Sequence, residues 1–171
     1  MGTMLFAAGL QDGDSPEPWN WEKPETVSAV YRAYYEAGSD VVQTNTFGGT
    51  PIKLSERDLQ DRTYEANYLA AKALRAVSPA DRYAAGDVGP TGKFMKPMGE
   101  YTREEFDDTY AAQIHGLVEG GVDLISIETM YSLEEAWCAL RAAKKASNLP
   151  VSVCMTYDRN PRGFFTLMGE T

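Results

Sequence analysis

Hydrophobic positions along this 171-residue chain recur with two different periods, and segments of the two kinds alternate. Apolar residues at helical spacing occupy four segments, residues 25–37, 56–76, 103–120 and 133–146. Short apolar runs follow these segments at residues 40–45, 82–89, 122–129 and 151–158. Helices that alternate with strands rich in Val and Ile are typical of a parallel sheet covered by helices. The sequence therefore predicts an α/β fold, and its periodicity is compatible with both a barrel and an open, doubly wound sheet.

Capping residues predict where two of these helices begin. Thr102 precedes the third helix and has Glu105 three residues after it, and Ser132 stands in the same relation to Glu135. A hydroxyl at the N-cap and a glutamate at the third helical position can satisfy each other's backbone amides. We therefore expect a capping box at each of these two starts.

Polar residues gather at the predicted carboxyl ends of the strands, where ligands bind in barrels and in open sheets alike. Glu128 ends an apolar strand, and a carboxylate buried there must be paired or protonated. A salt bridge with Arg32 or Lys93 would satisfy it, and so would a cationic ligand group such as the ammonium of an amino acid. Asn45 and Thr46 end an earlier strand and can either bind a ligand or stabilise their own turn.

The charge balance excludes several classes of partner. Sixteen basic residues against 25 acidic ones give a net charge of −9, which opposes binding to nucleic acid or to anionic membranes. The chain has no run of about eighteen apolar residues and no basic leader at its start. These features predict a cytoplasmic enzyme or binding domain.

Three further features do not match the chemistry that they first suggest. The segment 86–94 has five residues between its first glycine and Gly92, and a phenylalanine after the lysine, so it does not match a P-loop. We predict a tight glycine turn there. Cys138 and Cys154 lie in a helical and a strand pattern and are expected to be small buried hydrophobes. His115 is expected on a helix surface or partly packed, since no catalytic triad surrounds it.

The motifs of the chain, taken together and in order, resemble those of the homocysteine S-methyltransferase family. They are "MGTML", "SPEPWN", "AGSDVVQTNTFGG", "AAGDVGPTGK", "GLVEGGVDLISIETM" and "PVSVCMTYD". The pattern is nearest to the homocysteine-binding module of cobalamin-dependent methionine synthases, and the resemblance covers nearly the whole chain. Because this family has a (β/α)8 TIM barrel, the resemblance implies a partial barrel, about its first half.

The resemblance also implies roles for individual residues. In the family, the glutamate that ends the fourth strand binds the amino group of homocysteine, and Glu128 stands at that position. Gly2 and Thr3 match the loop after the first strand, near the amino acid end of the substrate. Asn45 and Thr46 match the polar floor after the second strand.

Zinc and methylcobalamin are the cofactors that the resemblance implies. In the family, three cysteines hold a zinc ion that binds the homocysteine thiol, and a cation of this kind lowers the pKa of the thiol. The thiolate then takes a methyl group from methylcobalamin, a betaine or a sulfonium compound. Neither Cys138 nor Cys154 matches a ligand position, so the zinc ligands are expected outside this chain. Homocysteine and a corrinoid protein or cobalamin domain are the expected partners.

The extent of the chain leads to three expectations. We expect residues 1–171 to be one barrel domain truncated at both ends, since the family's Asp-Gly motif would precede Met1 and a complete barrel needs about 250 residues. Such a fragment is expected to be inactive by itself. One alternative is a non-catalytic half-barrel that self-associates through its open edges or needs a partner chain. Another is a corrinoid-linked methyltransferase that acts on a different small substrate.

Overall fold

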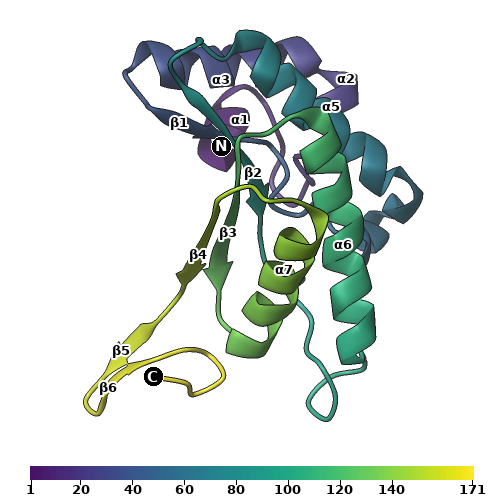
Figure 1. Ribbon diagram of the computed structural model, residues 1–171, viewed down its shortest axis with the longest axis vertical. Helices are drawn as coiled ribbons and strands as arrows, with labels where there is room; N and C mark the ends of the chain where they lie inside the picture. Colours follow the sequence, from purple (N-terminus) through teal and green to yellow (C-terminus); the bar gives the residue numbers. More distant parts are fainter.

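Four parallel strands form the central sheet of the computed structural model, which describes residues 1–171 (Figure 1). Their order in the sheet is their order in the chain: β1 (Val41–Gln43), β2 (Tyr83–Val88), β3 (Leu124–Met130) and β4 (Val151–Met155). Each of the four predicted strand segments coincides with one of them, and only β3 extends past its segment, by one residue. The predicted α/β fold with parallel pairing is therefore confirmed.

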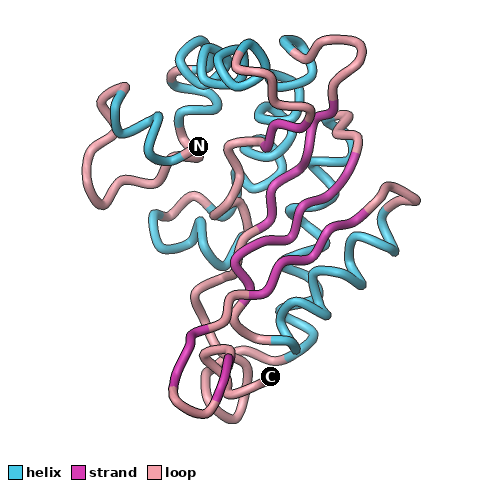
Figure 2. Tube along the Cα trace, turned by 90° about the vertical axis from the view of Figure 1, so that its left-hand side faces the viewer, coloured by secondary structure: helices cyan, strands magenta, loops and turns pink.

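Helices precede or follow each of these strands. They are α1 (Gly2–Ala7), α2 (Trp19–Glu22), α3 (Pro24–Glu36), α4 (Pro51–Leu54), α5 (Thr63–Val77), α6 (Arg103–Gly120) and α7 (Leu133–Ala146), with 3-10 turns η1 (Ser55–Arg57) and η2 (Gln60–Arg62). After β4 the chain forms an antiparallel hairpin of β5 (Asp158–Asn160) and β6 (Gly163–Phe165). Figure 2 shows the parallel strands side by side and this hairpin beyond the end of the sheet.

Helices cover one face of the sheet. Where α6 and α7 pack on β3, the core includes Phe106, Leu117, Ile125 and Ile127, each 0% exposed. A second cluster joins α1, α3 and α5 to β1 and β2. Alternate residues of β3, such as Ser126, point to the other face and are only half-buried. A doubly wound sheet carries helices on both faces, so this one-sided cover is that of a barrel wall.

The two predicted capping boxes have different outcomes. At the start of α6, the Glu105 amide donates to Thr102 Oγ1 (3.2 Å) and the Thr102 amide donates to Glu105 Oε2 (2.7 Å), which confirms the first box. At the start of α7, the Glu135 amide donates to Ser132 Oγ (3.3 Å). The Glu135 side chain instead turns into the protein, so this box is only half formed.

Two expectations about local structure are wrong. The helix expected over residues 56–76 begins at Thr63, because Asp58 adopts a left-handed backbone conformation (φ 57°) that divides residues 55–62 into two 3-10 turns. Cys154 is exposed and not buried, because β4 is the edge of the sheet. Cys138 is buried and His115 is exposed on α6, as expected.

Candidate functional site

Four polar side chains lie on the sheet face that the helices leave uncovered. Ile127 packs in the helix-covered core, so its neighbours Ser126 and Glu128 point to the opposite face. On β2, Asp87 is the register partner of Ser126. On β1, Gln43 pairs with β2 two residues before Asp87 and lies on the same face. The sheet therefore brings an amide, a hydroxyl and two carboxyls together at the carboxyl ends of three strands.

Gln43 links the outer strand β1 to β3 across this face. Its Nε2 donates hydrogen bonds to Ser126 Oγ (3.1 Å) and to Glu128 Oε2 (2.8 Å). On β2 the register partner of Gln43 is Ala85, which in turn pairs with Leu124 on β3, two residues before Ser126. Glu128 thus has a fixed orientation and a neutral hydrogen-bond partner.

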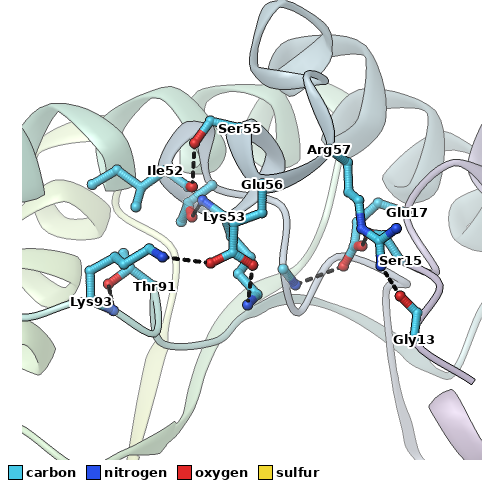
Figure 3. A network of polar contacts seen from close by, with 12 residues as sticks. Gly13, Ser15, Glu17, Ile52, Lys53, Ser55, Glu56, Arg57, Thr91 and Lys93 are labelled. Atoms are coloured by element: carbon cyan, nitrogen blue, oxygen red, sulfur yellow. Dashed lines mark hydrogen bonds and ion pairs between the residues drawn. The ribbon is translucent and has the colours of Figure 1, made fainter.

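The salt bridge that could have paired Glu128 does not form. Lys93 Nζ pairs with Glu56 Oε1 at 2.8 Å, and Figure 3 shows Lys93 and Lys53 converging on this glutamate. Arg32 makes no ion pair, and the half-buried Glu128 has no cationic partner. The interpretation of Glu128 as half of a structural ion pair is therefore wrong.

The backbone is irregular directly after Glu128. Thr129 has a φ of 61°, which is rare for a β-branched residue, and the pairing of β3 with β4 shifts register between Ile127 and Met130. Irregularities of this kind redirect side chains and recur next to functional sites. Here the irregularity lies directly beside Glu128.

The loop after β1 holds the backbone of Asp87 from both sides. The Asp87 amide donates to Thr44 Oγ1 (2.9 Å), and its carbonyl accepts from Thr46 Oγ1 (2.7 Å) and Gln113 Nε2 (3.3 Å). Thr46 uses its single hydroxyl proton in this bond, so Thr44 is the donor in the 2.6 Å contact between the two hydroxyls. Thr46, a predicted site residue, is fully buried, and its bond to this carbonyl helps to position Asp87.

The other predicted site residues have the following places. Asn45 is 2% exposed, and its Nδ2 donates to the Pro16 carbonyl (2.8 Å) and to Asn20 Oδ1 (3.0 Å), so it ties the loop before α2 to the end of β1. Gly2 and Thr3 form the first turn of α1, where Gly2 is half-buried and Thr3 is exposed.

Asp87 is a candidate that the sequence reasoning missed. Its side chain is 4% exposed, and Oδ1 has no hydrogen-bond partner. Burial raises the pKa of this carboxyl well above its usual value, and the charge of Glu128 raises it further. The signal was the one that singled out Glu128, an acidic residue in an apolar strand, but Asp87 was read as part of the glycine turn that follows.

A third carboxyl group, that of Glu135, lies beneath that turn. Its Oε1 accepts from the Thr91 amide (2.8 Å), the Thr91 hydroxyl (2.8 Å) and the Tyr110 hydroxyl (2.7 Å), whereas Oε2 has no partner. Burial is the main cause that raises the pKa of Glu135. Gly92 has a φ of +76°, which fits the predicted glycine turn. Glu135 thus fastens the turn to α7.

The residues of this chain do not fit a zinc centre. No group of three or more His, Cys, Asp or Glu side chains is placed to hold a metal ion. Burial raises the pKa of the Cys138 thiol to about 12, which opposes the thiolate form that binds metal, and Cys154 lies exposed on β4.

No helix has the length and apolar character needed to cross a membrane.

Comparisons with known proteins show the family and the fold. A family model described as homocysteine S-methyltransferase matches residues 1–171. A methionine synthase of Mycobacterium tuberculosis (strain ATCC 25618 / H37Rv) is 30% identical over 158 residues, which are 85% of this chain and 13% of that protein.

Solved structures resemble the chain as well. The metallated and oxidised forms of the homocysteine methyltransferase MmuM from Escherichia coli superpose with TM-scores of 0.75 and 0.76, at 21% and 22% identity. The matches cover 88% and 90% of this chain and 59% of each solved chain. The shared fold confirms the partial barrel, and the chain spans less than two thirds of these relatives.

Proposed function

Because the chain belongs to the homocysteine S-methyltransferase family, we propose that it forms the homocysteine-binding wall of a methyltransferase that produces methionine. The observation that carries this proposal is that the Glu128 carboxylate has no cation beside it. Its carboxylate is half-buried at a strand end, is oriented by Gln43 and lacks a cationic partner. The ammonium of an amino acid supplies the missing cation.

The residues around Glu128 have separate roles in the proposed binding of homocysteine. Gln43 occupies Oε2 and leaves Oε1 to the ligand. Asn45 and Thr46 shape the polar floor through the bonds that hold the loop after β1, and Gly2 and Thr3 lie near the amino acid end of the substrate. The thiol of homocysteine is the methyl acceptor, because a thiolate is a strong nucleophile.

The cofactors of this reaction would come from outside residues 1–171. Zinc, which activates a bound thiol, needs ligands that this chain does not have. Methylcobalamin, carried by a corrinoid protein or a cobalamin domain, is the methyl donor that the similarity to methionine synthase favours. We place the reaction in the cytoplasm.

Residues 1–171 would then be the first part of a larger barrel domain. β1 and β4 are the edges of the sheet, and Ser152, Val153 and Cys154 of β4 are exposed where a further strand would pair. By itself this part would lack activity. Turnover of homocysteine to methionine by the purified 171-residue chain, in the absence of any other protein, would contradict this.

The same exposed edges support a second candidate function, a half-barrel module that self-associates. The mass of the chain in solution separates the two candidates. A defined dimer supports the module, and a monomer rules it out.

The main test is the substitution Glu128→Gln in the protein expressed at the full length of its open reading frame. Loss of a hydrogen bond to a charged group costs roughly 1.5 to 3 kcal/mol, so calorimetry should show homocysteine binding roughly tenfold to a hundredfold weaker, with the metal content unchanged. Glu104→Gln, on the exposed surface of α6, is the matched control and should bind as the wild type does. Unchanged affinity of Glu128→Gln would refute the proposed role.

A further inference from the structure

We infer that Asp87 is a second carboxylate of the ligand site, and that Asp87 and Glu128 together receive one primary ammonium group. The inference rests on the proposed function, because both require Glu128 to bind the ligand. It adds a residue that the family resemblance does not name, and it defines the chemical class of ligand that the site accepts.

The two carboxyl groups lie on adjacent strands and on the same face of the sheet. Asp87 pairs with Ser126, and Glu128 is two residues further along β3. A strand spacing of about 4.8 Å and a rise of about 3.3 Å per residue place the two Cα atoms roughly 8 Å apart. Side chains that extend from these positions can meet on either side of one small group.

Asp87 has an acceptor that the protein leaves unused. The side chain is 4% exposed and Oδ1 has no donor, although buried polar atoms are almost always paired. Thr44 and Thr46 fix the backbone from which this side chain extends, because they bond to the Asp87 amide and carbonyl. A ligand on the uncovered face can supply the missing donor.

The charges around this acceptor favour a cation that has N–H hydrogen-bond donors. The titratable groups that interact with the Asp87 carboxyl through charge are Glu128, Glu17, Tyr31 and the amino group of Met1, and the last of these lowers its pKa. The two carboxyl groups among them repel an anionic ligand. A quaternary ammonium brings charge but no N–H donor, whereas a primary ammonium brings the charge and three donors. One donor can reach Asp87 Oδ1 and another can reach Glu128 Oε1.

Binding should then release a proton. In the empty site, burial and the charge of Glu128 raise the pKa of the Asp87 carboxyl and favour its protonated form. An ammonium beside it favours the carboxylate, so the O–H bond of Asp87 breaks and its proton passes to solvent while the ligand keeps all three N–H bonds. Since the proton and the ammonium compete, affinity for the ammonium should rise as pH increases through the pKa of the empty site.

The test is calorimetry of homocysteine binding to the full-length protein in buffers of different ionisation enthalpy, which counts the protons released. The wild type should release up to about one proton more than Asp87→Asn, and the variant should bind about tenfold more weakly at high pH with a flatter pH dependence. Any proton lost by the substrate thiol is common to both proteins, so the difference reports Asp87. Asp108→Asn, on the exposed surface of α6, is the matched control. Asp87→Ser, a smaller neutral side chain, repeats the test if Asp87→Asn does not fold.

The outcomes separate this inference from the proposed function. Equal proton release and equal affinity in Asp87→Asn, with weaker binding in Glu128→Gln, would overturn the inference and leave the proposed function intact. Tighter binding of tetramethylammonium than of homocysteine would overturn the inference and favour a corrinoid-linked enzyme for quaternary amines. A wild type that binds methylammonium but not homocysteine would support the inference and overturn the proposed substrate.

Discussion

The two faces of β3 differ in how completely their side chains are satisfied. Ile125 and Ile127 face α6 and α7 and are 0% exposed. Ser126 and Glu128, in alternate positions of the same strand, are half-buried and share one donor, Gln43. The helix-covered face has its packing partners within the chain, whereas the uncovered face retains a free carboxylate oxygen. One strand thus has a fully packed side and a side with an unpaired acceptor.

The largest expected effect comes from truncating the helix-covered face. Ile127→Ala should lower the free energy of unfolding by about 2 to 5 kcal/mol, because it leaves a cavity against α6 and α7. Urea denaturation measures this change. Val153→Ala, at the register partner of Ile127 on the exposed edge, should cost clearly less. Similar losses for the two variants would mean that the two positions are equally well packed.

Glu135 is an exception to this difference between the two faces, because it is a carboxyl group buried on the helix-covered side. Its pKa is raised from 4.5, so the folded protein holds the proton more tightly than the unfolded chain does, and stability should fall as pH rises from about 4.5 through the folded pKa. Glu135→Gln removes this titration. The free energy of unfolding of this variant, measured relative to that of the wild type, should therefore increase as pH rises over this range. The increase should be smaller than the free energy lost in Ile127→Ala. Parallel pH profiles of the two proteins in urea denaturation would show that Glu135 does not contribute.

The smallest effect is expected on the uncovered face. Ser126→Ala removes one acceptor of Gln43 but leaves the bond from Gln43 to Glu128, so it should cost about 0.5 to 1.5 kcal/mol of stability. Homocysteine affinity should change by less than in Glu128→Gln. Urea denaturation and calorimetry on one preparation test both. A loss of stability as large as that of Ile127→Ala would remove the distinction between the two faces.

The sequence predicted the features that depend on local patterns. The apolar periods located all four parallel strands, and the hydroxyl and glutamate spacing located the start of α6. The same spacing misassigned the Glu135 side chain, because its partners Thr91 and Tyr110 lie 44 and 25 residues away in the sequence. Spacing along a helix cannot show such a contact.

The candidate site was predicted only in part, for a related reason. Glu128 was found because a charge at the end of an apolar strand stands out in the sequence itself. Its orientation by Gln43 depends on pairing register across 85 residues, and the unpaired oxygen of Asp87 depends on what surrounds it in three dimensions. The break at Asp58 also escaped prediction, since a left-handed aspartate has no distinctive apolar pattern.

The agreement between strand order and chain order has a consequence for biosynthesis. Because β1 to β4 pair in sequence, a ribosome delivers each strand beside one that has already been made. Gln43, Asp87 and Glu128 can therefore meet as soon as β3 has emerged, so the candidate site is assembled early. The newest strand is always the open edge, and its unpaired backbone exposes the nascent chain to aggregation. The growing edge is accordingly the part of the nascent protein that a chaperone would have to shield.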